Sequence, residues 1–258
     1  MENKKIHTMI CTLLSTLWLL LVSPLSAAEI NSPAEAIYKA ADLRMLTQRM
    51  LKNYALVGMD IRARKAGKEL TLSLKQFETQ LSELLNHTTD DNTRNHLNEV
   101  SSLWEKLKPG YLTSPSKASA EALRTQSETL LQAADKATLS LRAQANPAIG
   151  KWVELSGRQA MLSQRITATY ALMAWGYEDQ YRESYKTSYQ VFSQTLKTLE
   201  HNPTNSTSIN DALETIRRQF NRIKQPSKDN VFVPGLVNRS SDKMLKSINQ
   251  LTQLYANL

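Results

Sequence analysis

The chain has 258 residues, of which 41% are hydrophobic and 22% are charged, and its formal net charge is +8. These values are close to globular averages, so they exclude a disordered chain and allow one or two domains with proper cores. Seven glycines and eight prolines are few for a protein rich in turns, which favours long helices joined by few connections.

The first 28 residues are predicted to be a cleaved signal peptide. A short basic start precedes an apolar run at 10–22, and the small residues Ser26 and Ala28 suit cleavage after Ala28. The run is shorter than the roughly 20 residues that cross a bilayer, although an uncleaved inner-membrane anchor is the alternative. We therefore expect a periplasmic protein. Its single cysteine, Cys11, leaves with the signal peptide, which excludes disulfides and thiolate metal sites from the mature chain.

Prolines, glycines and polar clusters divide the remaining chain into eight predicted helices. A capping residue followed by proline opens a helix at Ser32-Pro33 and again at Asn146-Pro147. We expect every proline of the mature chain in a break or at a helix start. No stretch alternates as a strand does, so the predicted class is all-α. The predicted helices cover 33–64, 69–85, 92–107, 119–144, 147–175, 181–199, 208–223 and 236–255, with a bend at 65–68 and a turn at 176–180.

The helical pattern occurs twice. "RMLTQRM" at 44–50 is followed 116 residues later by "AMLSQRI" at 160–166, and aligning 43–57 with 159–173 gives seven identities in fifteen positions. We interpret this as duplication of a four-helix unit. The expected fold is two tandem antiparallel four-helix bundles, the first at 29–144 and the second at 145–258.

The repeated motif has a structural interpretation. Arg49 and Arg165 lie beside the predicted buried stripe, so their apolar stems are expected to cover the bundle while their guanidinium groups pair with a carboxylate or a carbonyl. Gln48 and Gln164 are expected to tie adjacent helices. All the arginines of the motif are thereby placed at the flank of the core. The stripe follows steps of three or four residues and consists of Leu43, Leu46, Met50, Val57 and Ile61.

"LRMLTQRM" (43–50) and "SGRQAMLSQRI" (156–166) resemble the first-helix signature of PilJ/NarX-type sensory modules, which occur in the extracytoplasmic parts of chemoreceptors and of nitrate/nitrite sensor kinases. The resemblance covers the whole mature chain as two modules. It implies helical bundles and, in the nitrate-sensing branch, an arginine of the first helix that binds the anion at a dimer interface. Arg44 matches that arginine. Ala160 takes its place in the second module, where Arg158 is the second candidate ligand.

Two hypotheses for the function follow. The leading one is an exported, non-enzymatic sensory protein that binds a small oxyanion such as nitrate or nitrite, because guanidinium offers paired donors that match planar oxyanions. It would signal through an inner-membrane receptor, kinase or nucleotide cyclase. The alternative is a periplasmic structural or adaptor protein that has lost ligand binding, which Ala160 favours.

The resemblance and the residues also set expectations about partners. A symmetric site with two arginines equivalent to Arg44 would need two chains, so a homodimer through the first module is expected if an anion binds. The sequence contains no catalytic constellation, metal-ligand spacing or glycine-rich phosphate loop. We therefore expect no enzymatic activity, cofactor or metal, and export removes nucleic acid as a partner of this basic chain.

Overall fold

The computed structural model describes residues 30–223 and 231–258, and these parts of the chain are almost entirely helical. The predicted all-α class is confirmed, since the described residues contain no strand. Among the same residues, no helix combines the length and the apolar character that crossing a bilayer requires. The predicted signal peptide at 1–28 lies outside them. The helices are α2 (Pro33–Gly58), α3 (Ala63–His87), α4 (Asp91–Tyr111), α5 (Lys117–Ala143), α6 (Pro147–Leu172), the π-helical turn η2 (Met173–Tyr177), α7 (Glu178–Glu200), α8 (Thr207–Phe220) and α9 (Pro234–Ala256).

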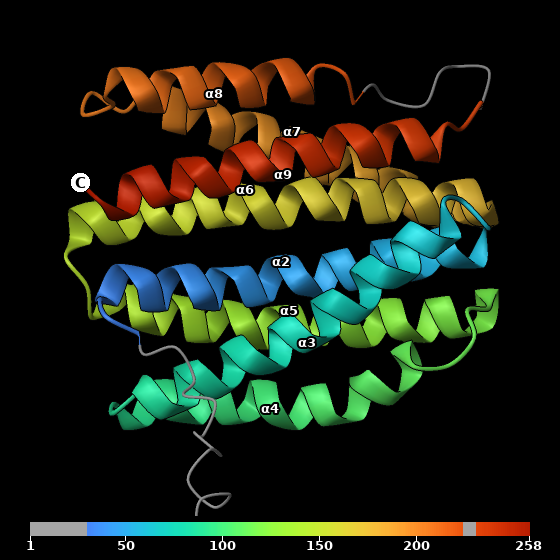
Figure 1. Cartoon of the computed structure of the whole chain (residues 1–258), viewed down its shortest axis with the longest axis horizontal. Coiled ribbons are helices and arrows are strands. Elements are labelled where there is room, and N and C mark those ends of the chain that lie inside the picture. Colours follow the sequence, from blue (N-terminus) through green and yellow to red (C-terminus); the bar gives the residue numbers. More distant parts are fainter. Residues whose placement is uncertain (1–29, 224–230) are drawn as a thin grey trace, which may run out of the picture.

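Helices α2 and α6 begin where a capping residue and a proline were predicted to open them. The side-chain oxygen of Ser32 accepts a hydrogen bond from the backbone N–H of Glu35 at 3.1 Å, and that of Asn146 accepts one from Ala148 at 3.0 Å. In both helices a proline occupies the first turn, where its missing N–H costs no helical hydrogen bond. Both helices start at the same end of the molecule (Figure 1).

The turn between α2 and α3 differs from the prediction. We expected the first helix to cover 33–64 and the chain to bend at 65–68, but α2 already ends at Gly58. The turn that follows contains two residues with positive φ, Asp60 at 56° and Arg62 at 53°. The predicted position of the bend was therefore wrong.

Contacts with the second half of the chain explain this early end. A Cβ on Gly58 would lie 2.2 Å from the indole ring of Trp175, so only glycine fits beneath that ring. The side chain of Ile61 then lies beside Gly235 at the start of α9. Ile61, whose spacing predicted a longer helix, thus packs against the second half of the chain instead. Gly67, which we assigned to the bend, lies inside α3.

Pro109 contradicts the expectation that every proline falls in a break or at a helix start. Helix α4 continues through Pro109 to Tyr111, so the proline lies in its last turn. Proline removes one N–H donor and crowds the carbonyl of the preceding turn, and a helix end tolerates this better than a helix interior. The buried Tyr111 holds the turn in place, because its hydroxyl lies 2.7 Å from Ser127 Oγ of α5.

The predicted turn at 176–180 is shorter in the structure. Helix α6 ends at Leu172 and passes through η2 directly into α7. Gly176 has a φ of 105° there, a conformation that L side chains rarely adopt. One glycine therefore makes the reversal for which we had expected a separate loop.

Helices α2 and α6 lie side by side at the centre of the molecule and run in the same direction (Figure 1). Helices α3 and α5 pack on α2, while α7 and α9 pack on α6. A Cβ on Gly157 of α6 would lie only 2.5 Å from the Cβ of Ala41 of α2. These two residues are equivalent in the repeat, since 157 − 41 = 116. Equivalent residues meet across two-fold axes, so the repeats are arranged like the subunits of a symmetric dimer.

The contact between α2 and α6 joins the hydrophobic residues of both repeats into one cluster. The first three residues of the predicted stripe are fully buried, whereas Val57 and Ile61 are partly exposed. Burial also extends around α2, because nearly all residues at 36–56 are buried. The second repeat covers the side of α2 that an isolated bundle would leave in water. The division into bundles at 144/145 stays a prediction.

Candidate functional site

Arg44, the predicted anion ligand, lies in the middle of α2 and forms two ion pairs within the chain. Its Nη1 donates to Asp135 Oδ1 of α5 at 2.5 Å and to Glu154 Oε1 of α6 at 3.1 Å. Its Nη2 lies 3.5 Å from the backbone carbonyl of Glu154. The other carboxylate oxygen of Glu154 lies 3.7 Å from Arg142 Nη1. The guanidinium group thus joins α2 and α5 of the first repeat to α6 of the second.

Arg44 is buried, which corrects the expectation that the arginines flank the core. Its side chain is 1% exposed and that of Glu154 is 5% exposed, whereas Asp135 faces solvent with 45% exposed. The reason is that α6 packs over the side of α2 that carries Arg44. A buried guanidinium needs such partners, because an unpaired buried charge is strongly unfavourable. Arg44 Nε remains buried without a hydrogen-bond partner.

Arg158, the second candidate ligand, does not join Arg44 in one site. Arg158 is exposed on the surface of α6. The neighbouring Gly157 faces α2, where Arg44 Nη2 would lie 3.8 Å from a Cβ at that position. Ala160, at the position equivalent to Arg44, is buried. Among the described residues, the interface between the repeats therefore holds one buried arginine, without a symmetric counterpart.

The two arginines of the repeated Gln-Arg motif pair with carboxylates in different ways. Arg49 pairs with Glu69 of α3 in its own repeat, whereas Arg165 pairs with Glu128 of α5 in the other repeat. In both pairs the arginine side chain is about one-fifth exposed, so each pair lies at the edge of the core. The motif arginine of the second repeat therefore holds the two repeats together.

The motif glutamines also differ. Gln164 Nε2 donates to Ser241 Oγ of α9 at 3.1 Å and so ties α6 to its neighbour. Gln48 Nε2 instead lies 3.3 Å from Thr47 Oγ1 on the same helix. Both glutamines are buried. Only in the second repeat do the recorded bonds of the glutamine link two helices.

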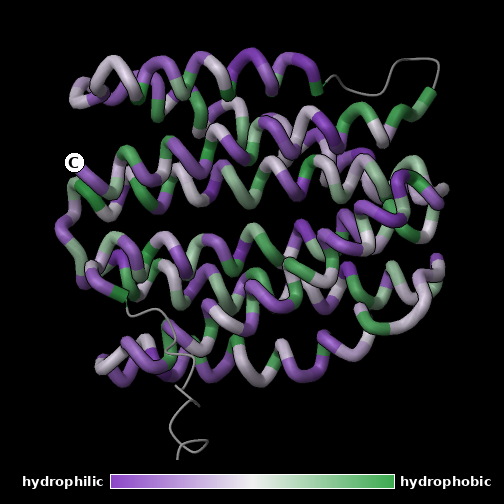
Figure 2. Tube along the Cα trace, viewed as in Figure 1, coloured by the Kyte–Doolittle hydropathy of each residue, from purple (hydrophilic) through white to green (hydrophobic). Residues whose placement is uncertain are grey.

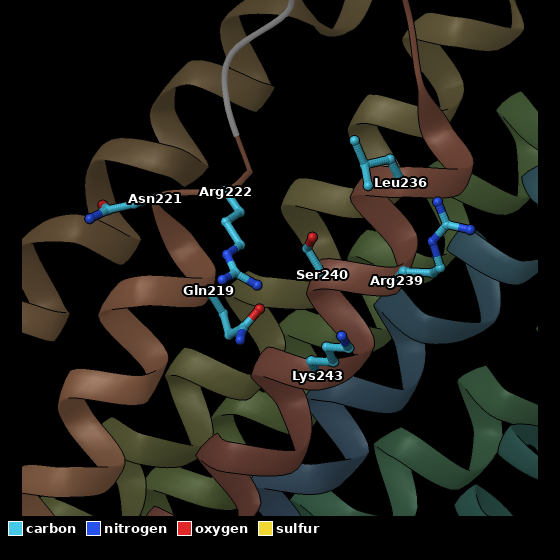
Figure 3. Close-up of a pocket in the computed structure, with 7 residues that line it drawn as sticks. All are labelled: Gln219, Asn221, Arg222, Leu236, Arg239, Ser240 and Lys243. Carbon is cyan, nitrogen blue, oxygen red and sulfur yellow. The ribbon is translucent and has the colours of Figure 1, made fainter.

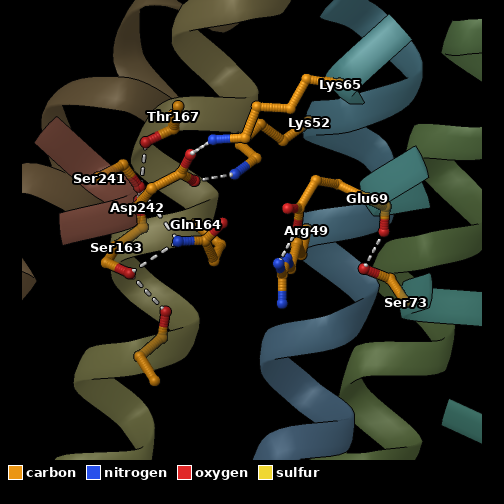
Figure 4. Close-up of polar contacts among 11 residues, drawn as sticks. Arg49, Lys52, Lys65, Glu69, Ser73, Ser163, Gln164, Thr167, Ser241 and Asp242 are labelled. Atoms are coloured by element: carbon orange, nitrogen blue, oxygen red, sulfur yellow. Dashed lines mark hydrogen bonds and ion pairs between the residues drawn. The ribbon is translucent and has the colours of Figure 1, made fainter. Parts of the chain in front are cut away.

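A buried lysine at the same interface was not predicted (Figure 4). Lys52 is 1% exposed, and its Nζ donates to Asp242 Oδ1 of α9 at 3.0 Å. Lys65 Nζ lies 3.5 Å from the second oxygen of that carboxylate. Burial lowers the pKa of Lys52, and the charge of Asp242 opposes this shift. The ion pair therefore keeps a charge at a position where burial favours the neutral amine.

This pair has an approximate counterpart across the two-fold arrangement. Asp242 is equivalent to Glu128, since 242 − 128 = 114, the offset at which α5 and α9 align. Glu128 pairs with Arg165 on α6, and Asp242 pairs with Lys52 on α2. Each last helix thus gives a carboxylate to the first helix of the other repeat. The alignment could have revealed the two carboxylates, but not the helix on which each finds its partner.

Asp42 is a third buried charged group of α2 and faces α3. Its Oδ2 accepts hydrogen bonds from Gln76 Nε2 at 2.7 Å and from Gln80 Nε2 at 2.8 Å. Burial raises the pKa of Asp42 to about 6, although both amides and the nearby Arg49 favour the ionised form. Burial therefore makes the ionised form of Asp42 unfavourable at neutral pH, in spite of its two hydrogen bonds.

No group of His, Cys, Asp and Glu side chains within the described ranges is arranged to hold a metal ion. The arrangement instead consists of ion pairs that join helices around two long central ones. Such a fold and site define an all-α module of two packed repeats that are held together by ion pairs between helices.

The family comparison agrees with this class. The model of the PilJ family, described as the N-terminal part of type IV pili methyl-accepting chemotaxis transducers, matches residues 26–138. This segment, which holds α2, α3, α4 and most of α5, matches the PilJ family model, and the predicted resemblance is confirmed for it. No curated protein and no solved structure gave a match. The second repeat is related to this segment by its alignment with the first repeat, and the family match does not extend to it.

Proposed function

We propose that this chain is an exported, non-enzymatic module of the chemotaxis-transducer sensory type whose anion position is filled by its own carboxylates. It then acts as an adaptor that presents surfaces to an inner-membrane receptor, kinase or cyclase. The observation that carries this proposal is the pairing of Arg44 with Glu154 and Asp135. It favours the adaptor over the oxyanion sensor.

Charge and geometry both support a filled site. A carboxylate has the planar pair of oxygens with which nitrate or nitrite would meet a guanidinium group. Glu154 offers such a group from the facing helix, and Asp135 adds a second. A further anion at Arg44 would add a third negative charge to a site that holds Arg44 and the partly exposed Arg142. It would therefore have to displace one of the two carboxylates.

The pairing of the repeats supports the same conclusion for the homodimer. A dimer through the first module would need the face of α2 that α6 covers in this chain. One chain therefore supplies both halves of the interface at which a family sensor would bind its anion. The surfaces of the outer helices remain available for contacts with a membrane partner.

Calorimetric titration tests the filled site. Nitrate, nitrite and acetate are titrated into the chain from residue 29, with chloride at matched ionic strength as the control, and we expect no binding above that control. Arg44→Gln is titrated in parallel, with Arg158→Gln as the matched surface variant. Wild-type binding of nitrate or nitrite that disappears in Arg44→Gln but persists in Arg158→Gln would overturn the filled site and establish the sensor.

A further inference from the structure

A pocket of about 460 Å³ lies between the end of α8 and the start of α9 (Figure 3). In the figure, Arg222 and Lys243 extend toward the space between the two helices, and Ser240 faces the same space. Arg239 extends from the other flank of α9. Three of the lining side chains are cationic and none is acidic. The lining residues are Gln219, Asn221, Arg222, Leu236, Arg239, Ser240 and Lys243.

The three cations of this pocket have no carboxylate partner within 30–223 and 231–258. The nearest carboxylate along α9 is that of Asp242, which is already bound to Lys52 and Lys65 on the other side. Arg218, one turn earlier on α8, does pair with Glu214, so the surface around the pocket is not generally short of acids. Cations on one surface without a counter-charge among the described residues attract an anion.

Three exposed apolar side chains lie within three residues of the start of α9. Val231 is 63% exposed, Val233 is 46% exposed and Leu236, which lines the pocket, is 51% exposed. Figure 2 shows the start of α9 as a hydrophobic stretch. A single exposed apolar residue needs no explanation. Three of them around the start of a helix whose cations have no partner among the described residues match surfaces that place apolar groups at the acyl boundary and cations at lipid phosphates.

The turn between α2 and α3 extends this basic surface. Ile61 of the turn lies beside Gly235 of α9, which places the turn next to the start of that helix. The hollow at the turn contains one acidic residue, and its lining residues are Asp60, Arg62, Ala63, Arg64, Lys65 and Lys68. Both hollows lie at the end of the bundle opposite to the start of α2 (Figure 1). One end of the molecule is therefore basic and partly apolar.

We propose that this end binds anionic phospholipids, with a headgroup phosphate in the pocket between α8 and α9. A free phosphate compound has the same charged group, but it would leave the three apolar side chains around the start of α9 in water. The lipid surface uses both features, because the phosphates meet the cations and the apolar side chains enter the interface. This binding is independent of whether Arg44 takes an anion.

Vesicle co-sedimentation of the chain from residue 29 tests the proposal. We expect binding to vesicles of equal parts phosphatidylglycerol and phosphatidylcholine, weaker binding at higher salt, and little binding to phosphatidylcholine alone. Lys243→Gln should weaken binding about fivefold, and the triple variant with Arg222→Gln and Arg239→Gln about a hundredfold, since each cation contributes a similar factor. Lys197→Gln, an exposed lysine near the end of α7, is the matched control and should bind as the wild type.

The contribution of the apolar side chains around the start of α9 is tested by a second matched pair. Leu236→Ser should weaken vesicle binding, whereas Leu139→Ser on α5, where the leucine is 44% exposed, should not. Circular dichroism verifies that each variant is folded. Equal losses in Lys243→Gln and Lys197→Gln would overturn the site, because they would indicate a general attraction of a basic protein to the membrane. Binding of glycerol 3-phosphate by calorimetry without vesicle binding would overturn the lipid proposal in favour of a soluble phosphate ligand.

Discussion

Removing the carboxylate of Glu154 should destabilise the protein and create a vacancy that a small anion can fill. Glu154→Ala leaves Arg44 buried with Asp135 alone, and breaking a buried ion pair by deleting one partner costs about 3–5 kcal/mol. We expect the lower end, about 3 kcal/mol, because Asp135 remains in place at 2.5 Å. The contact of Glu154 with Arg142 adds little, since that arginine side chain is 40% exposed.

Thermal unfolding by circular dichroism measures this effect. For a domain of this size, a loss of about 3 kcal/mol lowers the melting temperature by roughly 6–12 °C. Acetate or nitrate at ten times its dissociation constant should return about 1.4 kcal/mol of the loss in Glu154→Ala, and chloride at matched ionic strength should not. Glu99→Ala removes an exposed carboxylate that pairs with Lys136 and should change stability by less than about 0.5 kcal/mol. A Glu154→Ala variant that melts like the wild type would refute the reasoning about Arg44.

Three further predictions concern α2 and its neighbours. Gly157→Val should destabilise the chain by about 1–3 kcal/mol in urea unfolding, because its Cβ would lie 2.5 Å from that of Ala41. The control is Gly67→Ala, which should stabilise the chain by about 0.5–1 kcal/mol, because its Cβ meets only Val57 at 3.9 Å. Because burial raises the folded-state pKa of Asp42 from 3.8 to about 6, protonation stabilises the fold, and this contribution is present below pH 4 and lost as the pH rises through 6. Asp42→Asn should therefore be more stable than the wild type at pH 7–8, by up to about 3 kcal/mol, and unfolding across the pH range should show no such gain below pH 4. The fragment 29–144 should dimerise in light scattering, since it exposes the face of α2 that α6 covers in the whole chain; a monomeric folded fragment would contradict the pairing of the repeats.

Local rules in the sequence predicted the helices but not the environment of the site. Ser32 and Asn146 opened the two central helices as expected, because a cap and a proline act within one turn. The partner of Arg44 could not be predicted in this way, since Glu154 lies 110 residues further along the chain. The environment of Arg44 depends on α6 packing in parallel against α2. In the sequence, only the small residues at two equivalent positions, Ala41 and Gly157, indicate that packing.

The covalent joining of the two repeats permits an asymmetry that a homodimer cannot have. In a homodimer every substitution is made twice, so a glutamate facing one arginine would appear again beside the other. Here Tyr38 stands at the position equivalent to Glu154, since 154 − 38 = 116. Ala160 stands at the position equivalent to Arg44, since 160 − 44 = 116. Each copy was free to specialise, one keeping the cation and the other supplying its counter-ion. Fusion also makes the pairing intramolecular, so it does not weaken on dilution.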